Sequence, residues 1–472
     1  MSLVAGIDSS TQSCKVVIRD SVTGELIRSG RASHPAGTEV DPNAWFDALQ
    51  QAIADAGGFA DVEAVSIGGQ QHGMVLLDQD GRVIRKALLW NDTRSASTAT
   101  ELIDHFGLDY LVQNTGSAPV ASFTSSKVLW VLRNEPENAA RVAAVCLPHD
   151  WLSWRLAGFG PKGESEFGPD LSALATDASD ASGTGYFNPV TGEYLPKVWD
   201  YILGRVPALP RIVQPGEWAF APGAGNHFGI ACGAGDNAAA GLGLGADLGD
   251  VVVSLGTSGT VFAVTGQQTA DSTGTVAGFA SATGSFLPLV CTLNAARIMD
   301  SFASLLEVNH DALGELALTA EPGAAGVVVV PYFEGERTPN LPDAQGAVIG
   351  LTLANNTREN LARAAIEGML CGLADGFEVL KSHGVQAKRV LLIGGAGANR
   401  AVQISAAQIF GVDVVIPDPG EYVADGAARQ ASLALKGIPA GWQLGIKGSV
   451  AADSKPEILT QYHAARDSIY KI

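Results

Sequence analysis

The chain has 472 residues, too many for one ordinary hydrophobic core, so we expect two domains. A hydrophobic content of 46% and a charged content of 17% are typical of a compact globular enzyme and exclude a disordered or coiled-coil chain. The net charge of −19 argues against nucleic acid and against an anionic membrane as partners, because both attract clustered Lys and Arg.

Five widely spaced cysteines, with no CxxC pair, indicate free thiols in a reducing compartment. Their apolar or small neighbours predict burial; they are Cys14, Cys146, Cys232, Cys291 and Cys371. No Lys or Arg precedes Lys15, so we do not expect a signal peptide. The apolar run at residues 324–333 is shorter than the roughly 20 residues that span a bilayer. These features predict a cytoplasmic protein.

The first elements in chain order are two short strands joined by a polar loop. The predicted ranges are 4–7 and 15–19 for the strands and 8–13 for the loop. A turn, a helix opened by an Asp-Pro pair and a buried strand follow, at residues 23–24, 41–42 and 64–67. Residues 162–192 are rich in Gly, Ser, Asp and Pro, which predicts an irregular excursion near the mouth of a cleft.

The opening pattern recurs in the middle of the chain. A strand, a loop of Gly, Ser and Thr, and a second strand are predicted at residues 251–254, 255–259 and 260–264. The repeat indicates two domains built on one plan, at residues 1–244 and 245–472, whose hairpin tips face a shared cleft.

The second half also contains a long helix, a strand and a glycine-rich turn. Apolar residues at spacings of three to five predict one buried helix face, with Thr357 as the cap and Gly384 as the stop. A strand at 389–393 leads into a Gly-rich loop at 394–399 and then directly into another helix. Because strands alternate with helices in both halves, the fold class is α/β.

Three loops have the residues that phosphate groups bind. Each follows an apolar strand and offers backbone amides, hydroxyls or glycines that let a ligand come close, and the third opens a helix. The candidate ATP-binding residues are Ser9, Ser10 and Thr11, then Gly256, Thr257 and Ser258, then Gly394, Gly395 and Asn399. Each loop alone also fits an ordinary polar turn, but three in this βα context favour a nucleotide. The chain has no P-loop motif.

The expected binding of ATP also predicts a metal ion. This acidic chain has no basic run, so a polyanion such as ATP requires backbone N–H groups, a few local cations and a divalent metal. Asp8 directly follows the first strand, where its carboxylate could hold a metal ion through water.

The segment 233–240, GAGDNAAA, places Asp236 and Asn237 among small residues. Asp236 could take a proton from a substrate hydroxyl, with room for a ligand beside it. The alternative is that Asp236 only caps an Ala-rich helix. We favour the catalytic interpretation because the same chain also contains the candidate phosphate-binding loops.

A second group of residues suits a neutral sugar, which proteins bind through amide, imidazole and carboxylate groups beside an aromatic face. The candidates are Gln71 and His72, after one strand, and Trp90, Asn91 and Asp92, after another. The alternatives are a core histidine for His72 and a core aromatic for Trp90.

These segments together resemble the FGGY carbohydrate kinases, over nearly the whole chain from Val4 to Gln430. The likeness lies in ordered motifs: GIDSSTQSCKVVI (6–18), GGQQHGMVLLD (68–78), LLWND (88–92), SFTSSKVLWVLRN (122–134), GDNAAAG (235–241), SLGTSG (254–259), GERTP (335–339), GAVIGLTLANNTRENLARAAIE (346–367) and LLIGGAGAN (391–399).

The resemblance implies two ribonuclease-H-like domains, of the actin and hexokinase type, flanking a catalytic cleft. It implies that Asp236 is the catalytic base, that Asp8 positions Mg-ATP, and that Mg²⁺ lies by these two carboxylates. Gln71 and His72 would contact the sugar, with Asn237 at its reacting side, and the third loop and Thr257 would line the ATP site.

The expected reaction transfers the γ-phosphoryl group of ATP to a terminal hydroxyl of a ketopentose, and D-xylulose is the substrate that we expect first. The alternatives are ribulose, a deoxy-ketose or a polyol, and an actin-superfamily ATPase without a sugar substrate. The sequence does not decide between a homodimer and a monomer. Three positions depart from many relatives: Ser10 stands in place of Gly, Gln71 in place of Met, and His149 in place of Lys.

Overall fold

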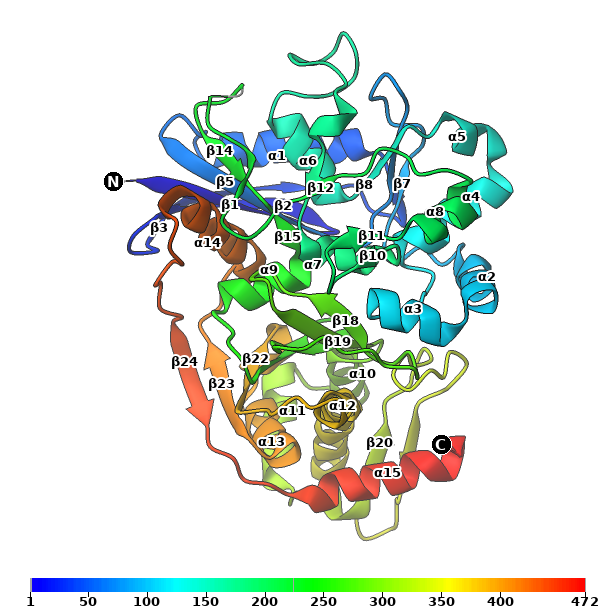
Figure 1. Cartoon of the computed structure of the whole chain (residues 1–472). Coiled ribbons are helices and arrows are strands. Elements are labelled where there is room, and N and C mark those ends of the chain that lie inside the picture. The colour runs from blue at the N-terminus through cyan, green and yellow to red at the C-terminus, as the bar shows by residue number, and fades with distance from the viewer. Residues whose placement is uncertain (1, 224, 472) are drawn as a thin grey trace.

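The computed structural model describes residues 2–223 and 225–471 and arranges them in two halves, each built on a seven-stranded sheet (Figure 1). The first sheet has the order β13-β14-β5-β1-β2-β3, with β15 paired to β5. Its strands are β1 (Leu3–Ser9), β2 (Ser13–Asp20), β3 (Leu26–Ser33), β5 (Val62–Gly69), β13 (Trp218–Phe220), β14 (Gly229–Ala231) and β15 (Ala234–Gly235).

The second sheet has the order β18-β19-β17-β16-β22-β23-β24. Its strands are β16 (Asp250–Leu255), β17 (Gly259–Ala263), β18 (Ala277–Ala280), β19 (Phe286–Thr292), β22 (Arg389–Ile393), β23 (Asp413–Pro417) and β24 (Ile446–Val450). Short strand pairs complete the sheet structure: β4 (Glu39–Val40) with β7 (Ala87–Leu88), β6 (Val75–Leu77) with β8 (Ala144–Cys146), β9 (Ala175–Thr176) with β12 (Arg211–Ile212), β10 (Phe187–Asn188) with β11 (Glu193–Tyr194), and β20 (Val328–Val330) with β21 (Ala347–Ile349).

The two sheets share one plan. β1 pairs antiparallel with β2 and parallel with β5, and β16 pairs antiparallel with β17 and parallel with β22. Both β1 and β16 are buried almost throughout, as expected for central strands covered on both faces. The α/β class and the repeated plan are therefore confirmed. The boundary at residue 245 stays a prediction.

Helices cover the sheets. The helices before β16 are α1 (Pro42–Asp55), α2 (Ala96–Phe106), α3 (Leu108–Thr115), α4 (Thr124–Asn134), α5 (Pro136–Arg141), α6 (Pro148–Leu156), α7 (Ala178–Ala181), α8 (Pro196–Leu203) and α9 (Asp236–Gly243). Those after it are α10 (Ala296–Leu305), α11 (His310–Thr319), α12 (Arg358–Ser382), α13 (Arg400–Phe410), α14 (Tyr422–Lys436) and α15 (Pro456–Tyr470).

The caps predicted for two helices are present. The Asp41 side chain accepts a hydrogen bond from the backbone N–H of Asn43 at the start of α1, and Thr357 accepts one from Asn360 at the start of α12. α12 ends just before Gly384, whose φ of 91° suits a glycine after a helix.

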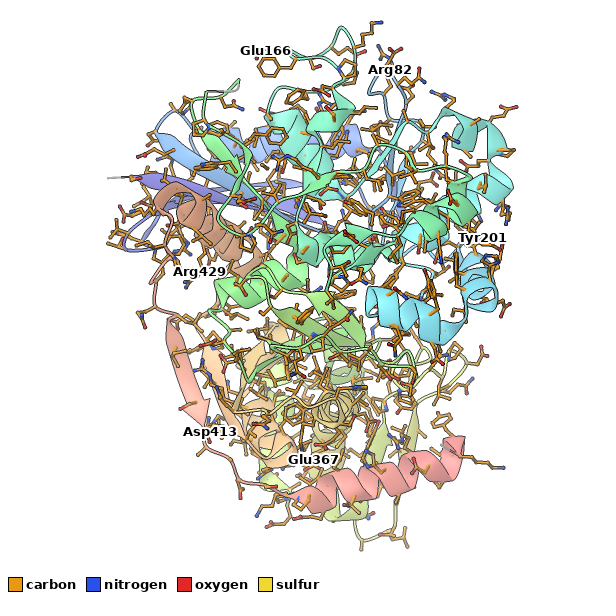
Figure 2. The ribbon with its side chains drawn as sticks, in the orientation of Figure 1. Arg82, Glu166, Tyr201, Glu367, Asp413 and Arg429 are labelled. Atoms are coloured by element: carbon orange, nitrogen blue, oxygen red, sulfur yellow. The ribbon has the colours of Figure 1, made fainter. Side chains whose placement is uncertain are left out.

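α12 differs from the prediction in its burial. The sequence predicts one apolar face, whereas every residue from 362 to 377 is buried. Small Ala and Gly residues on the other faces of α12 let neighbouring segments of the same chain approach closely. For example, a Cβ on Gly368 would lie 2.2 Å from the carbonyl oxygen of Val329. Glu367, labelled in the lower half of Figure 2, lies in this interior and pairs with Arg363 at 2.6 Å.

One loop prediction was wrong in detail. The excursion at residues 162–192 is irregular only in part, because α7 and the strands β9 and β10 lie in it and residues 174–187 are largely buried. The loop at 394–399 leads directly into α13, as predicted, and its residues Gly395–Ala398 form a short 3₁₀ turn.

α14 belongs to the second half of the sequence but lies against β1 and β5 of the first sheet (Figure 1). It crosses α9 at close range, because a Cβ on Gly426 would lie 1.8 Å from the carbonyl oxygen of Ala239. The side chain of Arg429 on α14 (Figure 2) donates to the carbonyl oxygens of Ala440 and Trp442, which ties the following segment to the helix.

All five cysteines are free thiols, and four of them are buried, as predicted; Cys291 is half-buried. Among the described residues, no helix combines the length and hydropathy needed to cross a membrane.

Candidate active site

Asp8 is a buried carboxylate near the end of β1, just before the chain turns. Its Oδ1 accepts a hydrogen bond from the Ser10 hydroxyl, and its Oδ2 lies 3.6 Å from the Lys15 ammonium. Burial raises the pKa of Asp8, while Ser10 and Lys15 act in the opposite direction. Lys15 also pairs with Glu421, just before α14, so distant segments of the chain meet at this loop.

Asp236 is the first residue of α9, and the cap position is occupied by Gly235. Its Oδ1 accepts hydrogen bonds from the backbone N–H and the side-chain amide of Asn237, at 2.8 and 3.0 Å. Burial, with a contribution from the charge of Asp8, raises the pKa of Asp236 to about 7 against the bonds from Asn237. The capping alternative is therefore not what the geometry shows, and the carboxylate is poised to exchange a proton near neutral pH.

Gln71 lies beside this carboxylate. Its side-chain oxygen accepts a hydrogen bond from the Asn237 amide at 3.2 Å, and its nitrogen donates to the backbone oxygen of Ser179 in α7 at 3.4 Å. A Cβ on Gly235 would lie 2.8 Å from the Gln71 side chain, so the glycine makes room for it. Gln71 thus links the predicted sugar-binding segment at 68–78 to the segment at 233–240 that contains Asp236.

His72 is held at several points. Its backbone φ is 68°, its carbonyl accepts a hydrogen bond from the buried Lys127 ammonium at 2.8 Å, and its ring stacks on Phe123. Nδ1 lies 2.6 Å from the carbonyl oxygen of Gly183. Because a carbonyl only accepts, Nδ1 carries the proton and Nε2 is left as an acceptor. Burial, with Lys127, lowers the pKa of His72 to about 3, so the ring is neutral.

The predicted residues Trp90, Asn91 and Asp92 have different surroundings. Trp90 is 43% exposed, and its indole N–H donates to the Thr11 hydroxyl at 2.9 Å, which joins the sugar-type and phosphate-type loops. Asn91 is exposed. Asp92 is buried, and both of its oxygens accept bonds from Arg94 or Thr38. Its carboxylate thus holds its own loop.

The predicted phosphate loops come together only in part. Ser9 is buried within β1, and the hydroxyls of Ser10 and Thr11 are bonded to Asp8 and Trp90, so this loop offers mainly its backbone. In the second half, Gly256, Thr257 and Ser258 form an exposed turn between β16 and β17.

The third loop lies directly against the second. A Cβ on Gly394 would lie 2.4 Å from the carbonyl oxygen of Leu255, and its φ is 91°, so only glycine fits. Gly395 faces open space. Asn399 caps α13 and donates to the backbone oxygen of His310 at 2.8 Å.

Nε2 of His310, at the start of α11, lies 2.8 Å from the carboxylate of Asp300 on α10. Both residues line an open depression of the surface, and the third loop reaches it through the bond from Asn399 to the His310 carbonyl oxygen. The lining residues of this depression are Asp300, Ala303, Ser304, Val308, Asn309, His310 and Asp311.

Sequence reasoning missed several residues that build this site. Lys127 holds His72, and Ser179 holds Gln71 and, through its hydroxyl, the backbone N–H of Gly235 at 3.1 Å. The available signals were the lysine in the apolar helix at 124–134 and the Asp177 cap before α7, whose carboxylate accepts from two backbone N–H groups.

Comparison with known proteins relates both halves of the chain to one family. Residues 3–243 match the N-terminal domain of the FGGY family of carbohydrate kinases, and residues 251–435 match its C-terminal domain. A xylulose kinase of Streptomyces rubiginosus is 43% identical over 449 residues, which are 92% of this chain and 88% of that protein.

Solved structures show the same relationship. The xylulose kinase of Bifidobacterium adolescentis superposes with a TM-score of 0.93 at 47% identity, over 98% of this chain and 99% of that one. A Plasmodium falciparum glycerol kinase solved with ADP shares the fold (TM-score 0.85, 19% identity, 100% and 98% covered). By sequence and by fold, this chain belongs to the FGGY family of carbohydrate kinases.

Proposed function

We propose that the protein transfers the γ-phosphoryl group of ATP to the terminal hydroxyl of D-xylulose, forming D-xylulose 5-phosphate. The observation that carries the proposal is the half-buried Asp236, whose pKa of about 7 suits a general base, beside the polar side chains of Gln71 and Asn237. The similar proteins from Streptomyces rubiginosus and Bifidobacterium adolescentis are both called xylulose kinases, which supports this substrate.

In the proposed mechanism, Asp236 orients the sugar hydroxyl and accepts its proton as the oxygen attacks phosphorus. Both bonds from Asn237 go to Oδ1, which leaves Oδ2 for the substrate. Neutral His72 accepts a hydrogen bond from another sugar hydroxyl through Nε2, and Gln71 fixes the position of the Asn237 amide.

The residues present fit Mg²⁺ and ATP. Asp8 supplies a carboxylate oxygen of the kind that Mg²⁺ prefers, and the open turn at 256–258 with Gly394 and Gly395 supplies backbone amides without side chains in the way. When bound, Mg²⁺ would supply positive charge to the transferring phosphoryl group.

The same site chemistry admits a second ketose or a polyol as substrate. The amide of Gln71, bonded to Asn237, keeps this open, because it makes that part of the proposed sugar pocket polar. The sugar-type residues around Asp236 do not favour an ATPase that lacks a sugar substrate.

The test is an assay of ATP consumption with a panel of D-xylulose, ribulose, deoxy-ketoses and polyols, with the phosphorylated position identified by NMR. We expect the highest kcat/KM for D-xylulose and phosphate on O5. A higher kcat/KM for another sugar would replace the substrate, and ATP hydrolysis that no sugar stimulates would reject the proposal.

A further inference from the structure

The short helix α7 supports the sugar pocket from behind. Its Ser179 accepts hydrogen bonds from Gln71 through the backbone oxygen and from the N–H of Gly235 through the hydroxyl. The same turn continues to Gly183, whose carbonyl fixes the proton on His72. A small movement of α7 therefore displaces three parts of the pocket at once.

α7 is itself anchored by a buried ion pair. Asp180 in α7 lies 2.6 Å from Nδ1 of His149 in α6, and both side chains are fully buried. The backbone leaves space for this ring, because a Cβ on Gly233 would lie 2.7 Å from its Nε2 and a Cβ on Gly69 would lie 2.8 Å from its Cβ. The glycines at positions 69 and 233 therefore make the space that the His149 ring occupies.

Three carboxyl groups surround His149. Asp150 approaches Nε2 at 3.3 Å, Asp180 bonds to Nδ1, and Asp177 caps α7. Burial opposes a charge on the ring, but Asp150 and Asp180 raise the pKa of His149 to about 10. The ring is therefore an imidazolium, which compensates carboxylates that burial would otherwise neutralise.

We infer that His149 is a positioning residue for phosphoryl transfer: its positive ring holds Asp180 and thereby fixes the α7 turn that supports Gln71 and the backbone before Asp236. The inference rests on the proposed sugar kinase activity. Because His149 is fully buried against α7, it acts through Ser179. A lysine at this position would supply the same charge.

The charge on His149 gives the inference a pH signature. The pKa of the His149 ring is raised from the ordinary 6.5 to about 10, so the ring keeps its charge until the pH rises through about 10. Burial raises the pKa of Asp180 to about 6, so the ion pair is also lost as the pH falls through about 6. A lysine in the same surroundings starts from an ordinary pKa of about 10.4 instead of 6.5, so it would keep its charge to higher pH. The other titratable groups around the pair are Asp150, Asp177 and Asp180, with Cys146, Cys232, Tyr186 and Tyr194 beside them and Asp236 beyond Asp180.

The experiment uses the full chain with His149→Gln, His149→Lys and Asp180→Asn, assayed on the sugar that the wild type uses best. We expect His149→Gln and Asp180→Asn to lower kcat by up to about 10²-fold, the effect of a displaced reacting group, with KM for ATP nearly unchanged. His149→Lys should restore most of kcat and extend activity to higher pH. The matched control is His463→Gln, which breaks a second His–Asp contact of 2.6 Å, to Asp375, in the other half.

Each other outcome overturns the inference. Folded His149→Gln or Asp180→Asn with wild-type kcat and pH profile would show that the pair does not position the site. A His149→Lys protein as impaired as His149→Gln would show that shape matters and charge does not. Failure of all three variants to fold would assign the pair to the fold alone, and a metal ion held by these side chains would replace the imidazolium. Inactivity of the wild type on every sugar would instead reject the proposed function.

Discussion

At the scale of single residues, the proposed catalysis depends on the position of one carboxylate. Asp236 starts α9 directly after Gly235 and accepts two bonds from Asn237. Asp236→Asn keeps the size and the polar contacts but cannot accept a proton. We expect kcat to fall about 10²–10⁴-fold with binding of sugar and ATP retained, measured by steady-state kinetics and calorimetry. Asp109→Asn, at an exposed carboxylate on α3, is the control; wild-type turnover in Asp236→Asn would remove this residue from the mechanism.

The raised pKa of Asp236 predicts the pH dependence of the reaction. Burial raises this pKa to about 7, and only the deprotonated carboxylate can accept a proton. The value of kcat/KM for the sugar should therefore rise with pH, with an inflection near 7, and level off above it. His72, whose pKa is lowered to about 3, contributes no inflection in this range. A profile that is flat between pH 6 and 8 would contradict the assignment of Asp236 as base.

Gln71 gives a prediction about specificity. Both ends of its amide are bonded within the protein, to Asn237 and to Ser179. Gln71→Met would remove both bonds, at a cost of about 1–3 kcal/mol, which is about 5- to 150-fold in kcat/KM. We expect an equal loss for D-xylulose and for its deoxy analogues. A loss that disappears for one deoxy analogue would show instead that Gln71 bonds the missing hydroxyl directly.

At the scale of elements, the turn after β22 shows the backbone shape of the proposed nucleotide site. Gly394 has a positive φ and lies against Leu255, whereas a Cβ on Gly395 would meet no atom within 4 Å. Gly394→Ala should lower stability by about 1–3 kcal/mol and weaken ATP binding. Gly395→Ala should keep the melting temperature, so that any rise in its KM for ATP reports contact with the ligand. Equal stability of the two variants would show that Gly394 is not strained.

At the scale of the whole molecule, one contact between the two halves of the sequence is the crossing of α9 and α14. Gly426 approaches Ala239, and Gly243 approaches the carbonyl oxygen of Tyr422, so the two backbones lie close together. We expect this crossing to act as a hinge. We expect sugar and a non-hydrolysable ATP analogue together to lower the radius of gyration in small-angle scattering, because closure would exclude water from the site.

The control for closure is each ligand added alone, with binding confirmed by calorimetry. A radius of gyration that stays the same with both ligands bound would show that the halves do not close.

The sequence by itself determined the features that depend on neighbours along the chain. Strand and loop patterns around residues 8 and 256, the Asp-Asn pair at 236–237 and the cap at Thr357 are local, so their spacing predicts them. The ordered motifs also predicted the α/β class and the family. These predictions hold because turn chemistry, capping and hydrophobic periodicity act over a few residues.

Only the tertiary structure decided which distant groups meet. The bonds of Gln71 to Asn237, of Lys127 to the His72 carbonyl and of His149 to Asp180 join residues that lie 31 to 166 positions apart. α7 was hidden in a segment whose composition predicts an irregular loop, and α14 packs on the sheet of the other half. Local spacing carries no information about such contacts, since burial and charge compensation become defined only when the sheets and helices enclose the site.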